Sequence, residues 1–379
     1  MTITDMPRTT SDNTTRATGT SATSLGSTRA PRPNKAATDY IQLTETVRSM
    51  GLFKRELSWY HWRMARLGLL LASTIALFVM IGPSWWNLIT AALFSFFCAQ
   101  AAFLGHDAAH RQIYESGAAN GLASRILANL AVGLSYGWWL NKHGRHHANP
   151  NKVGKDNDIA PGALVFTPED AATRTGIGAW AARHQRQLFF PILLLLGLDL
   201  HRESILRVAN PKETVPHRAQ EALFLAIRLV ALPTAVVLFL GPTIGFTWMG
   251  VQLGLFGLYF GLVFAPNHLG MPIVPKDAGI DFLSRQVLMS RNIKGGWTIN
   301  ALMGGLNYQV EHHLFPTMSS RSLRRVQPLV QQFCKDKGIK YTATTLPEAF
   351  SSILDFLDGV GHGKVEMFSC PITGAMRTR

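Results

Sequence analysis

Long hydrophobic runs interrupt an otherwise polar chain at four places. They lie at about residues 66–82, 86–105, 222–240 and 243–265, and short turns join the first run to the second and the third to the fourth. A helix rises ~1.5 Å per residue, so about 18 to 20 apolar residues cross a hydrocarbon core of ~30 Å. The pattern predicts an all-α integral membrane protein with four transmembrane helices in two hairpins.

Details of these runs refine the prediction. The first run is short, and we expect its helix to extend through Met64 or into the Trp85–Trp86 pair. Arg228 lies within the third run, near enough to its end for the side chain to reach the interface. Two other apolar stretches, 122–140 and 188–198, are broken by polar residues, glycines or Pro191, and they are expected to be interfacial or re-entrant helices.

The two ends of the chain have a different composition. The first 40 residues are rich in Thr, Ser and Pro with scattered Arg, which predicts a disordered tail, although a transit peptide has a similar composition. Beyond the last run, one helix is expected from Ser319 or Ser320 to about Phe333, and another from Thr345 to about Gly359.

These features divide the chain into three regions. They are a tail at 1–40, a membrane domain at 41–325 and a C-terminal cytosolic helical region at 326–379. The C-terminal region is expected to contribute to a cytosolic helical cap that carries the metal-binding residues.

The distribution of positive charge predicts an orientation. The connecting turns contain no Lys or Arg, whereas ten precede Leu67, thirteen lie between His106 and Glu221, and thirteen follow Pro266. The positive-inside rule therefore places both termini and the central segment in the cytoplasm of a multi-pass cell-membrane protein. The net charge of +14 is dispersed, with no base-reading motif, which argues against a nucleic-acid partner. Attraction to anionic headgroups or to a phosphate-bearing substrate carrier explains the charge better.

Histidines gather where the hydrophobic runs end. Spacings of three or four residues put two imidazoles on one helix face, and neutral imidazole suits iron, copper, nickel and zinc. Eight imidazoles exceed the needs of one ion and suit two ions with four or five ligands each. The eight candidate ligands come from three short boxes and one single site. The first box (residues 106–110) holds His106 and His110, the second (143–147) holds His143, His146 and His147, the third (309–313) holds His312 and His313, and the single site is His268.

Other residues are expected to support the ligands or to have no part in metal binding. Asp107 and Glu311 are candidates to accept a hydrogen bond from a ligand's second ring nitrogen, and Asp156 and Asp158 are further candidates. Cysteines are too few and scattered for a disulfide framework or a zinc ribbon. The histidines with no partner at ligand spacing, which we expect not to bind metal, are His61, His184, His201, His217 and His362.

The boxes resemble those of the membrane fatty-acid desaturase family, over about residues 60–325 and most specifically from Gly304 to Pro316. Gln309 at the head of the third box is similar to the front-end and linoleoyl-CoA-desaturase-like branch. The resemblance implies four membrane helices under a cytosolic cap, a di-iron centre, O2 as co-substrate, and electrons from a cytochrome b5 type protein or a ferredoxin with its NAD(P)H reductase. The chain carries no HPGG haem motif of a fused cytochrome b5 domain, so we expect a separate donor.

The resemblance also bears on single residues. Gln309 can ligate through its amide oxygen or hydrogen-bond to a ligand, and we favour ligation. The stearoyl-CoA branch has an asparagine four residues before the position of His268, where this chain has Phe264, and Asn267 stands beside the histidine instead. Asn267 and Asn307 are further candidates for contacts that support the ligands.

The implied activity is desaturation of a fatty acyl chain carried by CoA or a lipid, at the surface of the bilayer. A lipid hydroxylase or ketolase is the nearest alternative, because both activities use the same ligand set. A metal transporter is less favoured, since its histidines would line a path through the bilayer, whereas all eight lie at or beyond the ends of the predicted spans.

Overall fold

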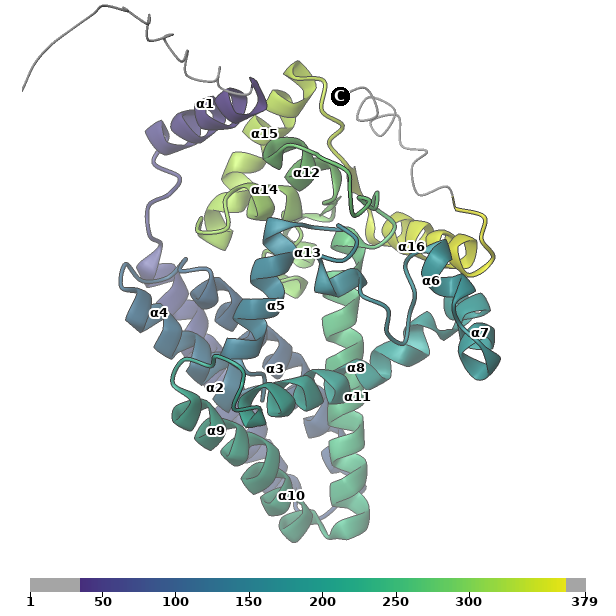
Figure 1. Cartoon of the computed structure of the whole chain (residues 1–379). Helices are drawn as coiled ribbons and strands as arrows, with labels where there is room; N and C mark the ends of the chain where they lie inside the picture. The colour runs from purple at the N-terminus through teal and green to yellow at the C-terminus, as the bar shows by residue number, and fades with distance from the viewer. Residues whose placement is uncertain (1–34, 366–379) are drawn as a thin grey trace, which may run out of the picture. The chain divides into compact units, whose positions relative to one another are not determined.

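The computed structural model describes residues 35–365, and this part of the chain is mainly helical (Figure 1). Two short strands, β1 (Asn292–Ile293) and β2 (Ala343–Thr344), pair in parallel. The α-helices are α1 (Lys35–Ser49), α2 (Leu57–Ile81), α3 (Leu88–Ala109), α4 (Gly117–Ser124), α5 (Tyr136–Ala148), α6 (Pro168–Ala172), α7 (Gly176–Arg183), α8 (Gln185–Ala209), α9 (Arg218–Ala226), α10 (Leu232–Leu240), α11 (Pro242–His268), α12 (Phe282–Leu288), α13 (Gly296–Leu302), α14 (Gln309–Leu314), α15 (Ser320–Asp336) and α16 (Leu346–Gly361).

Within residues 35–365, four helical segments are long and apolar enough to cross a membrane, the number that the sequence predicts. The first is α2, which extends through Met64 and ends before the Trp85–Trp86 pair. In the third, a π-helical segment at Ile227–Ala231 joins α9 to α10. The bounds of the four segments are Leu57–Ile81, Trp85–Ala109, Arg218–Leu240 and Pro242–His268.

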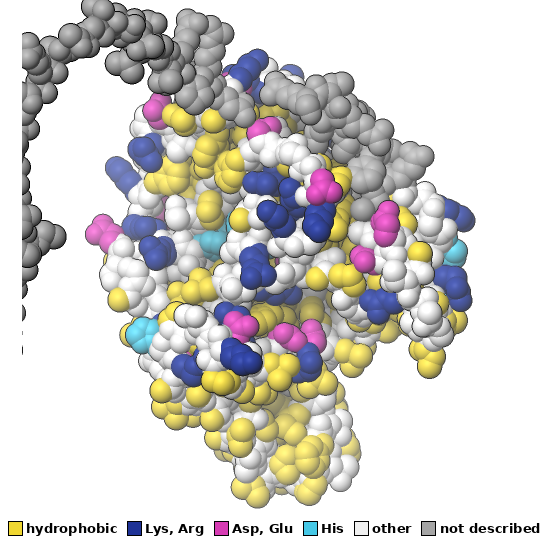
Figure 2. Space-filling model, in the orientation of Figure 1, with side chains coloured by type: hydrophobic (Ala, Val, Ile, Leu, Met, Phe, Trp, Pro, Cys, Tyr) yellow, Lys and Arg dark blue, Asp and Glu magenta, His cyan; other side chains and the backbone are white. Residues whose placement is uncertain are grey.

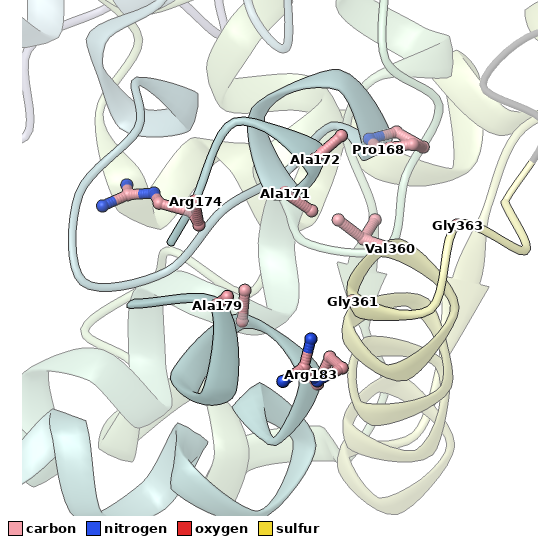
Figure 3. Close-up of a pocket in the computed structure, with 10 residues that line it drawn as sticks. Pro168, Ala171, Ala172, Arg174, Ala179, Arg183, Val360, Gly361 and Gly363 are labelled. Atoms are coloured by element: carbon pink, nitrogen blue, oxygen red, sulfur yellow. The ribbon is translucent and has the colours of Figure 1, made fainter. Parts of the chain in front are cut away.

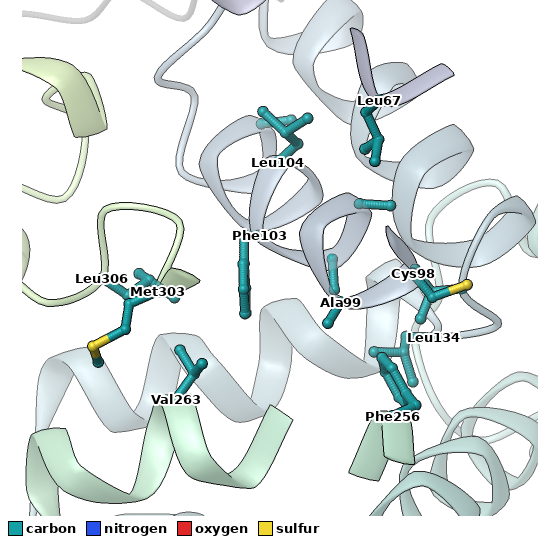
Figure 4. Close-up of a cluster of buried hydrophobic side chains, with 14 of the residues drawn as sticks. Leu67, Cys98, Ala99, Phe103, Leu104, Leu134, Phe256, Val263, Met303 and Leu306 are labelled. Carbon is teal, nitrogen blue, oxygen red and sulfur yellow. The ribbon is translucent and has the colours of Figure 1, made fainter. Parts of the chain in front are cut away.

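Two of the candidate spans form the centre of the largest hydrophobic core. Helix α3 contributes Phe103 and Leu104, α11 contributes Phe256 and Val263, and the turn before the third histidine box adds Met303 (Figure 4). In a bilayer the lipid tails are as apolar as these side chains, so close van der Waals packing, rather than removal from water, stabilises this contact. Because His106 lies in the last turn of α3 and His268 ends α11, the same contact places both histidines at one end of this helix pair.

Helix α8 is longer than the apolar stretch at 188–198 that it contains, and it is not among the candidate spans within residues 35–365. Pro191 does not limit the stretch at 188–198 to a short element, because it lies in the first two turns of a 25-residue helix. This helix approaches α11 backbone to backbone. A Cβ atom added at Gly197 would lie 2.5 Å from the carbonyl oxygen of Leu253, and one at Gly257 would lie 2.5 Å from the Gly197 nitrogen. Small residues permit such close helix packing.

The apolar stretch at 122–140 is divided among three pieces. Helix α4 continues into a π-helical segment, Arg125–Leu130, and the chain then turns before α5 begins. The buried carboxylate of Glu221, in α9, accepts hydrogen bonds from the Ser135 hydroxyl at 2.6 Å and from the Asn129 amide at 3.0 Å. It also accepts one from the backbone N–H of Gly137 at 3.0 Å. Glu221 therefore fixes the start of α5 against the third candidate span.

Arg228 does not reach the interface as expected. Its side chain is buried, and its guanidinium donates to the carbonyl oxygen of Ala131 at 3.1 Å and to the side chain of Gln252 at 3.3 Å. These acceptors explain the inward orientation, because a buried charge needs hydrogen-bond partners.

The ends of the described region differ slightly from the predicted boundaries. Helix α1 begins at Lys35, so residues 35–40 of the predicted tail are helical, while the prediction of disorder or a transit peptide for residues 1–34 lies outside the described residues. Helix α15 begins after Ser319 and crosses the boundary predicted at residue 325. Helix α16 begins with a capping box in which Thr345 and Glu348 bond to each other's backbone N–H groups.

Candidate metal centre

Each histidine box occupies a helix whose start or end is fixed by local hydrogen bonds. The first box ends α3, with His110 directly after the helix. The second lies on α5, where the Ser135 hydroxyl accepts from the backbone N–H of Trp138 as an N-cap. This helix presents His143, His146 and His147 at spacings of three and four residues.

The third box lies on the short helix α14, which follows a turn that requires glycine. Gly304 and Gly305 adopt φ values of 64° and 97°, which side chains rarely adopt. A Cβ atom at Gly304 would also lie 2.7 Å from the Phe103 ring. This turn buries Gln309, His312 and His313 against the ends of α3 and α11.

The eight predicted ligands come together in two groups. The first group has five histidines whose closest ring nitrogens all lie within 4.8 Å of one another. Its Nε2 atoms are 2.9 Å apart between His110 and His143 and 3.1 Å apart between His147 and His312. The members of this group are His106, His110, His143, His147 and His312.

The second group contains His146, His268 and His313, and it lies beside the first because His146 and His147 are adjacent on α5. The Nε2 atoms of His146 and His268 are 3.2 Å apart. The Gln309 side-chain amide nitrogen lies 2.9 Å from His268 Nε2. The amide oxygen of Gln309 is buried without a hydrogen-bond partner among residues 35–365. Exchanging the two ends of this amide would direct its oxygen toward His268 Nε2, beside the other two histidines, which makes Gln309 a candidate fourth ligand.

Hydrogen bonds to Nδ1 orient all three rings of the second group. Asp156 Oδ2 lies 2.9 Å from His146 Nδ1, and the Met289 carbonyl oxygen lies 2.9 Å from His268 Nδ1. Gln286 Oε1 lies 2.8 Å from His313 Nδ1. Each acceptor places the proton on Nδ1 and leaves Nε2 free to bind a metal.

The protonation equilibria also favour metal binding. Burial, and then the neighbouring histidines, lower the pKa of His110, His143 and His147 well below the ordinary value of 6.5. Burial and neighbouring histidines have the same effect on the pKa of His312 and His313. These rings are therefore neutral at physiological pH, which is the form that binds transition metals.

A transition metal fits this arrangement. Metal–nitrogen bonds to imidazole are ~2.0–2.1 Å long, so ligand nitrogens around one ion lie about 3–4 Å apart. The nitrogen separations of 2.9–3.2 Å in the groups are near the lower end of that range. Neutral rings whose lone pairs converge repel one another unless a cation lies between them.

Some of the residues predicted to support the ligands contact a histidine ring, and others do not. Asp156 contacts His146 as expected, and Asp158 Oδ2 lies 3.4 Å from the same nitrogen. Asp107 Oδ1 is 3.5 Å from His106 Nδ1, but its other oxygen accepts from Tyr60 and Ser320, which are stronger contacts at 3.1 and 2.8 Å.

Three predicted supporting residues bond elsewhere. The carboxylate of Glu311 accepts from Asn292 and Tyr341, both at 2.7 Å, and burial raises its pKa to about 7. The side-chain amides of Asn267 and Asn307 donate to the backbone oxygens of Val263 and Ile293. Glu311 points away from the histidine rings because side chains at adjacent helix positions do not share a face.

The contact from Gln286 was not predicted. Gln286 lies in α12, far from any histidine in sequence, and an isolated amide there gives no signal of its role. Met289 contributes a backbone carbonyl, which any residue type provides, so its contact was not recognisable either.

The remaining histidines lie outside both groups. His201 is buried and bonds to the carbonyl oxygen of Val132 at 2.9 Å, and burial lowers its pKa to about 4. The others contact single polar groups, such as Tyr114 near His61, or begin a helix, as His217 does.

An apolar cavity of about 250 Å³ reaches the histidine groups. Its lining includes apolar residues such as Leu193 and Phe260, together with His143, His146 and His268. Another pocket of about 250 Å³ lies between α6, α7 and the end of α16 (Figure 3), and it contains none of the eight histidines. Of these two cavities, only the first would hold an apolar molecule against the candidate metal site.

Comparisons with known proteins identify the family of the chain. Residues 83–345 match the sequence model of the fatty acid desaturase family. The chain is 29% identical over 329 residues to an acyl-lipid (9-3)-desaturase of Physcomitrium patens, which covers 83% of this chain and 61% of the relative. It is 27% identical over 366 residues to fatty acid desaturase 3 of Bos taurus, covering 91% and 79% of the two chains.

A third relative is a fatty acid desaturase 2-like protein of Mus musculus, 25% identical over 328 residues, covering 83% of this chain and 65% of the relative. The chain thus spans less than two thirds of the length of the moss and mouse relatives.

Proposed function

The chain belongs to the fatty acid desaturase family, and from this premise we propose that it is a membrane enzyme that introduces a cis double bond into a long fatty acyl chain. The observation that carries the proposal is the convergence of eight histidines where α3 and α11, two candidate spans, end. Histidines placed there meet a substrate whose acyl chain comes from the bilayer and whose polar end remains in water.

The proposed arrangement in the membrane is two hairpins, α2 with α3 and α9–α10 with α11. Tight turns at Gly82 and Gly241, both with positive φ, join the helices within each pair. The part of the surface where α10 and α11 meet is mainly hydrophobic (Figure 2). Together with the positive charges outside the turns, this supports a multi-pass cell-membrane protein whose histidines and cap face the cytoplasm.

Two iron ions are the proposed cofactors. The five histidines of the first group would hold one ion, and the three of the second group together with Gln309 would hold the other. Bound iron supplies the chemistry by which O2 and two electrons remove two hydrogens from adjacent, unactivated carbons. Asp156, Met289 and Gln286 keep the rings of the second group in the metal-binding tautomer.

The apolar cavity beside the histidines is the proposed acyl site. Its wall includes Leu193, Phe260 and Phe264, which exclude water from the chain. Because every methylene of the chain is chemically similar, the position of the chain along this wall selects the bond to be oxidised. The carrier of the chain is CoA or a lipid, and the electrons come from a ferredoxin or cytochrome b5 type protein with its NAD(P)H reductase.

Lipid analysis of a host that lacks desaturases tests the function. Expression of the full chain should give acyl chains lighter by two hydrogens, detected by mass spectrometry, and His143→Ala should abolish them. The matched control, His184→Ala, should retain activity because His184 lies outside both histidine groups and bonds to the Trp180 carbonyl oxygen. A dominant product heavier by one oxygen would instead identify a hydroxylase, and one that gains an oxygen and loses two hydrogens would identify a ketolase. An unchanged lipid profile would reject all three activities.

A further inference from the structure

A second and larger cavity adjoins the acyl site. It is a groove of about 1080 Å³ between α5, the loop after it and α8. The groove and the acyl site share wall residues, including Trp138, Leu164 and Leu193. The polar end of a substrate whose chain occupies the acyl site would therefore lie in this groove.

The charges in the groove balance. It is lined by four basic residues and four acidic residues, so its formal charge is zero, although the chain as a whole carries +14. Three of the four basic residues have an acidic partner: Lys142 pairs with Asp158 at 3.1 Å, Arg202 with Glu203 at 2.5 Å, and Arg207 with Glu213. Figure 2 shows the two kinds of charge side by side over the region that α8 occupies in Figure 1.

The groove also opens onto an exposed apolar surface of α8. Leu195 and Leu206 line the groove and are 63% and 48% exposed. Leu198 and Ile205, on the same helix, are exposed to a similar extent. Exposed leucines beside a charged stripe are typical of a helix that lies at the membrane interface. A lipid that remains in the bilayer can reach such an opening without leaving the membrane.

We propose that the acyl carrier is a zwitterionic glycerophospholipid, such as phosphatidylcholine, whose headgroup lies in this charge-balanced groove. This inference rests on the proposed desaturase function. A headgroup with one phosphate and one ammonium group matches alternating basic and acidic side chains. Coenzyme A carries about four negative charges on its phosphates, so it needs a surplus of basic residues, and this groove has none.

The first test compares the two carriers directly. The full-length protein, loaded with iron and placed in nanodiscs, receives the acyl chain that it desaturates in the expression host. The chain is supplied either on phosphatidylcholine within the disc or on CoA added to discs of non-reactive dialkyl phosphatidylcholine, with reductase and electron donor present. Turnover should be at least tenfold faster on the phospholipid. Faster turnover on CoA would overturn the inference and leave the desaturase function standing, whereas no product in the expression host would refute that function itself.

A variant with fewer carboxylates in the groove tests whether the charge balance of the groove selects the carrier. Asp199→Asn, Glu203→Gln and Glu213→Gln together remove three carboxylates from the groove and leave its basic residues in place. This variant should lower the KM for the acyl-CoA about tenfold or more, and raised salt should reverse the gain. The matched control removes three exposed carboxylates outside the groove, Glu45, Glu115 and Asp277, and should leave this KM unchanged.

Circular dichroism confirms that the groove variant is folded, and its KM for phosphatidylcholine should rise because the carboxylates that match the ammonium group are gone. Equal effects of the groove and control variants on the acyl-CoA KM would show that charge balance does not select the carrier, which would overturn the inference.

Discussion

Gln286 and His313 form a contact that joins α12 to the second histidine group: the amide oxygen of Gln286 accepts from His313 Nδ1 at 2.8 Å. The same amide donates through its nitrogen to the His147 carbonyl oxygen at 3.0 Å, which fixes the orientation of the amide. His313 Nε2 is buried and has no hydrogen-bond partner within the described chain. One glutamine thus orients a candidate ligand of one group and the backbone of a candidate ligand of the other.

Replacing this glutamine tests its role. Gln286→Leu removes the acceptor, so the His313 ring can rotate or adopt the other tautomer, and affinity for the second metal should fall about 10- to 100-fold. Gln286→Glu keeps an acceptor at the same distance and should bind metal better than the leucine variant. Metal retained after dialysis against a graded chelator measures the effect, and circular dichroism reports the fold. Equal metal affinity in the two variants would contradict the assigned role.

The two acids near His146 should differ in importance. Asp156 is buried, lies 2.9 Å from the His146 nitrogen, and accepts a backbone hydrogen bond from Asn151 at 2.8 Å. Asp158 lies at 3.4 Å, and its side chain is 42% exposed. Asp156→Ala should therefore weaken metal binding by at least tenfold, and Asp158→Ala should do so only slightly. Metal titration of each purified variant measures the difference, and an equal or reversed order would contradict this account.

Close packing between α8 and α11 should be sensitive to a single methyl group. Gly197→Ala places a Cβ atom 2.5 Å from the Leu253 carbonyl oxygen, so the helices must separate, at a cost of about 1–3 kcal/mol. The matched control is Gly250→Ala on α11, where a Cβ atom meets no other atom within 4 Å. Thermal unfolding in detergent should show a lower Tm for Gly197→Ala alone. A similar Tm in both variants would contradict the observed packing.

The sequence was sufficient to predict the four candidate spans and the eight converging histidines. Length and hydropathy determine where a helix can cross a membrane, and spacings of three and four residues place imidazoles on one face of α5. His106 and His268 were predicted to lie on one face of the membrane, because each stands at the end of its own span.

The sequence was less informative where the outcome depends on tertiary contacts. The full length of α8 was missed because Pro191 was taken to limit the element, whereas it lies near the helix start and interrupts only one turn. The inward orientation of Arg228 depends on Gln252 of another helix. The role of Gln286 and the separation of the histidines into groups of five and three also depend on long-range packing, which no local pattern encodes.

Electron supply gives a biochemical prediction. With NADPH and O2 alone the purified chain should show no turnover, because the proposed function requires electrons from a separate carrier. Addition of a reductase with a ferredoxin or cytochrome b5 type protein should restore activity. If the carrier is acidic, the rate should fall as salt is raised, since the chain is strongly basic. Turnover by the purified chain with NADPH alone would contradict a separate donor.

The most direct test of the proposed centre is the metal content of the full-length protein. Protein from iron-replete medium should contain about two transition-metal ions per chain by elemental analysis, with zinc counted because it competes for such ligands. His313→Ala should lower this to about one, because it removes a ligand of the three-histidine group and leaves the five-histidine group intact. A single ion per wild-type chain with all eight histidines present would contradict the two-ion centre.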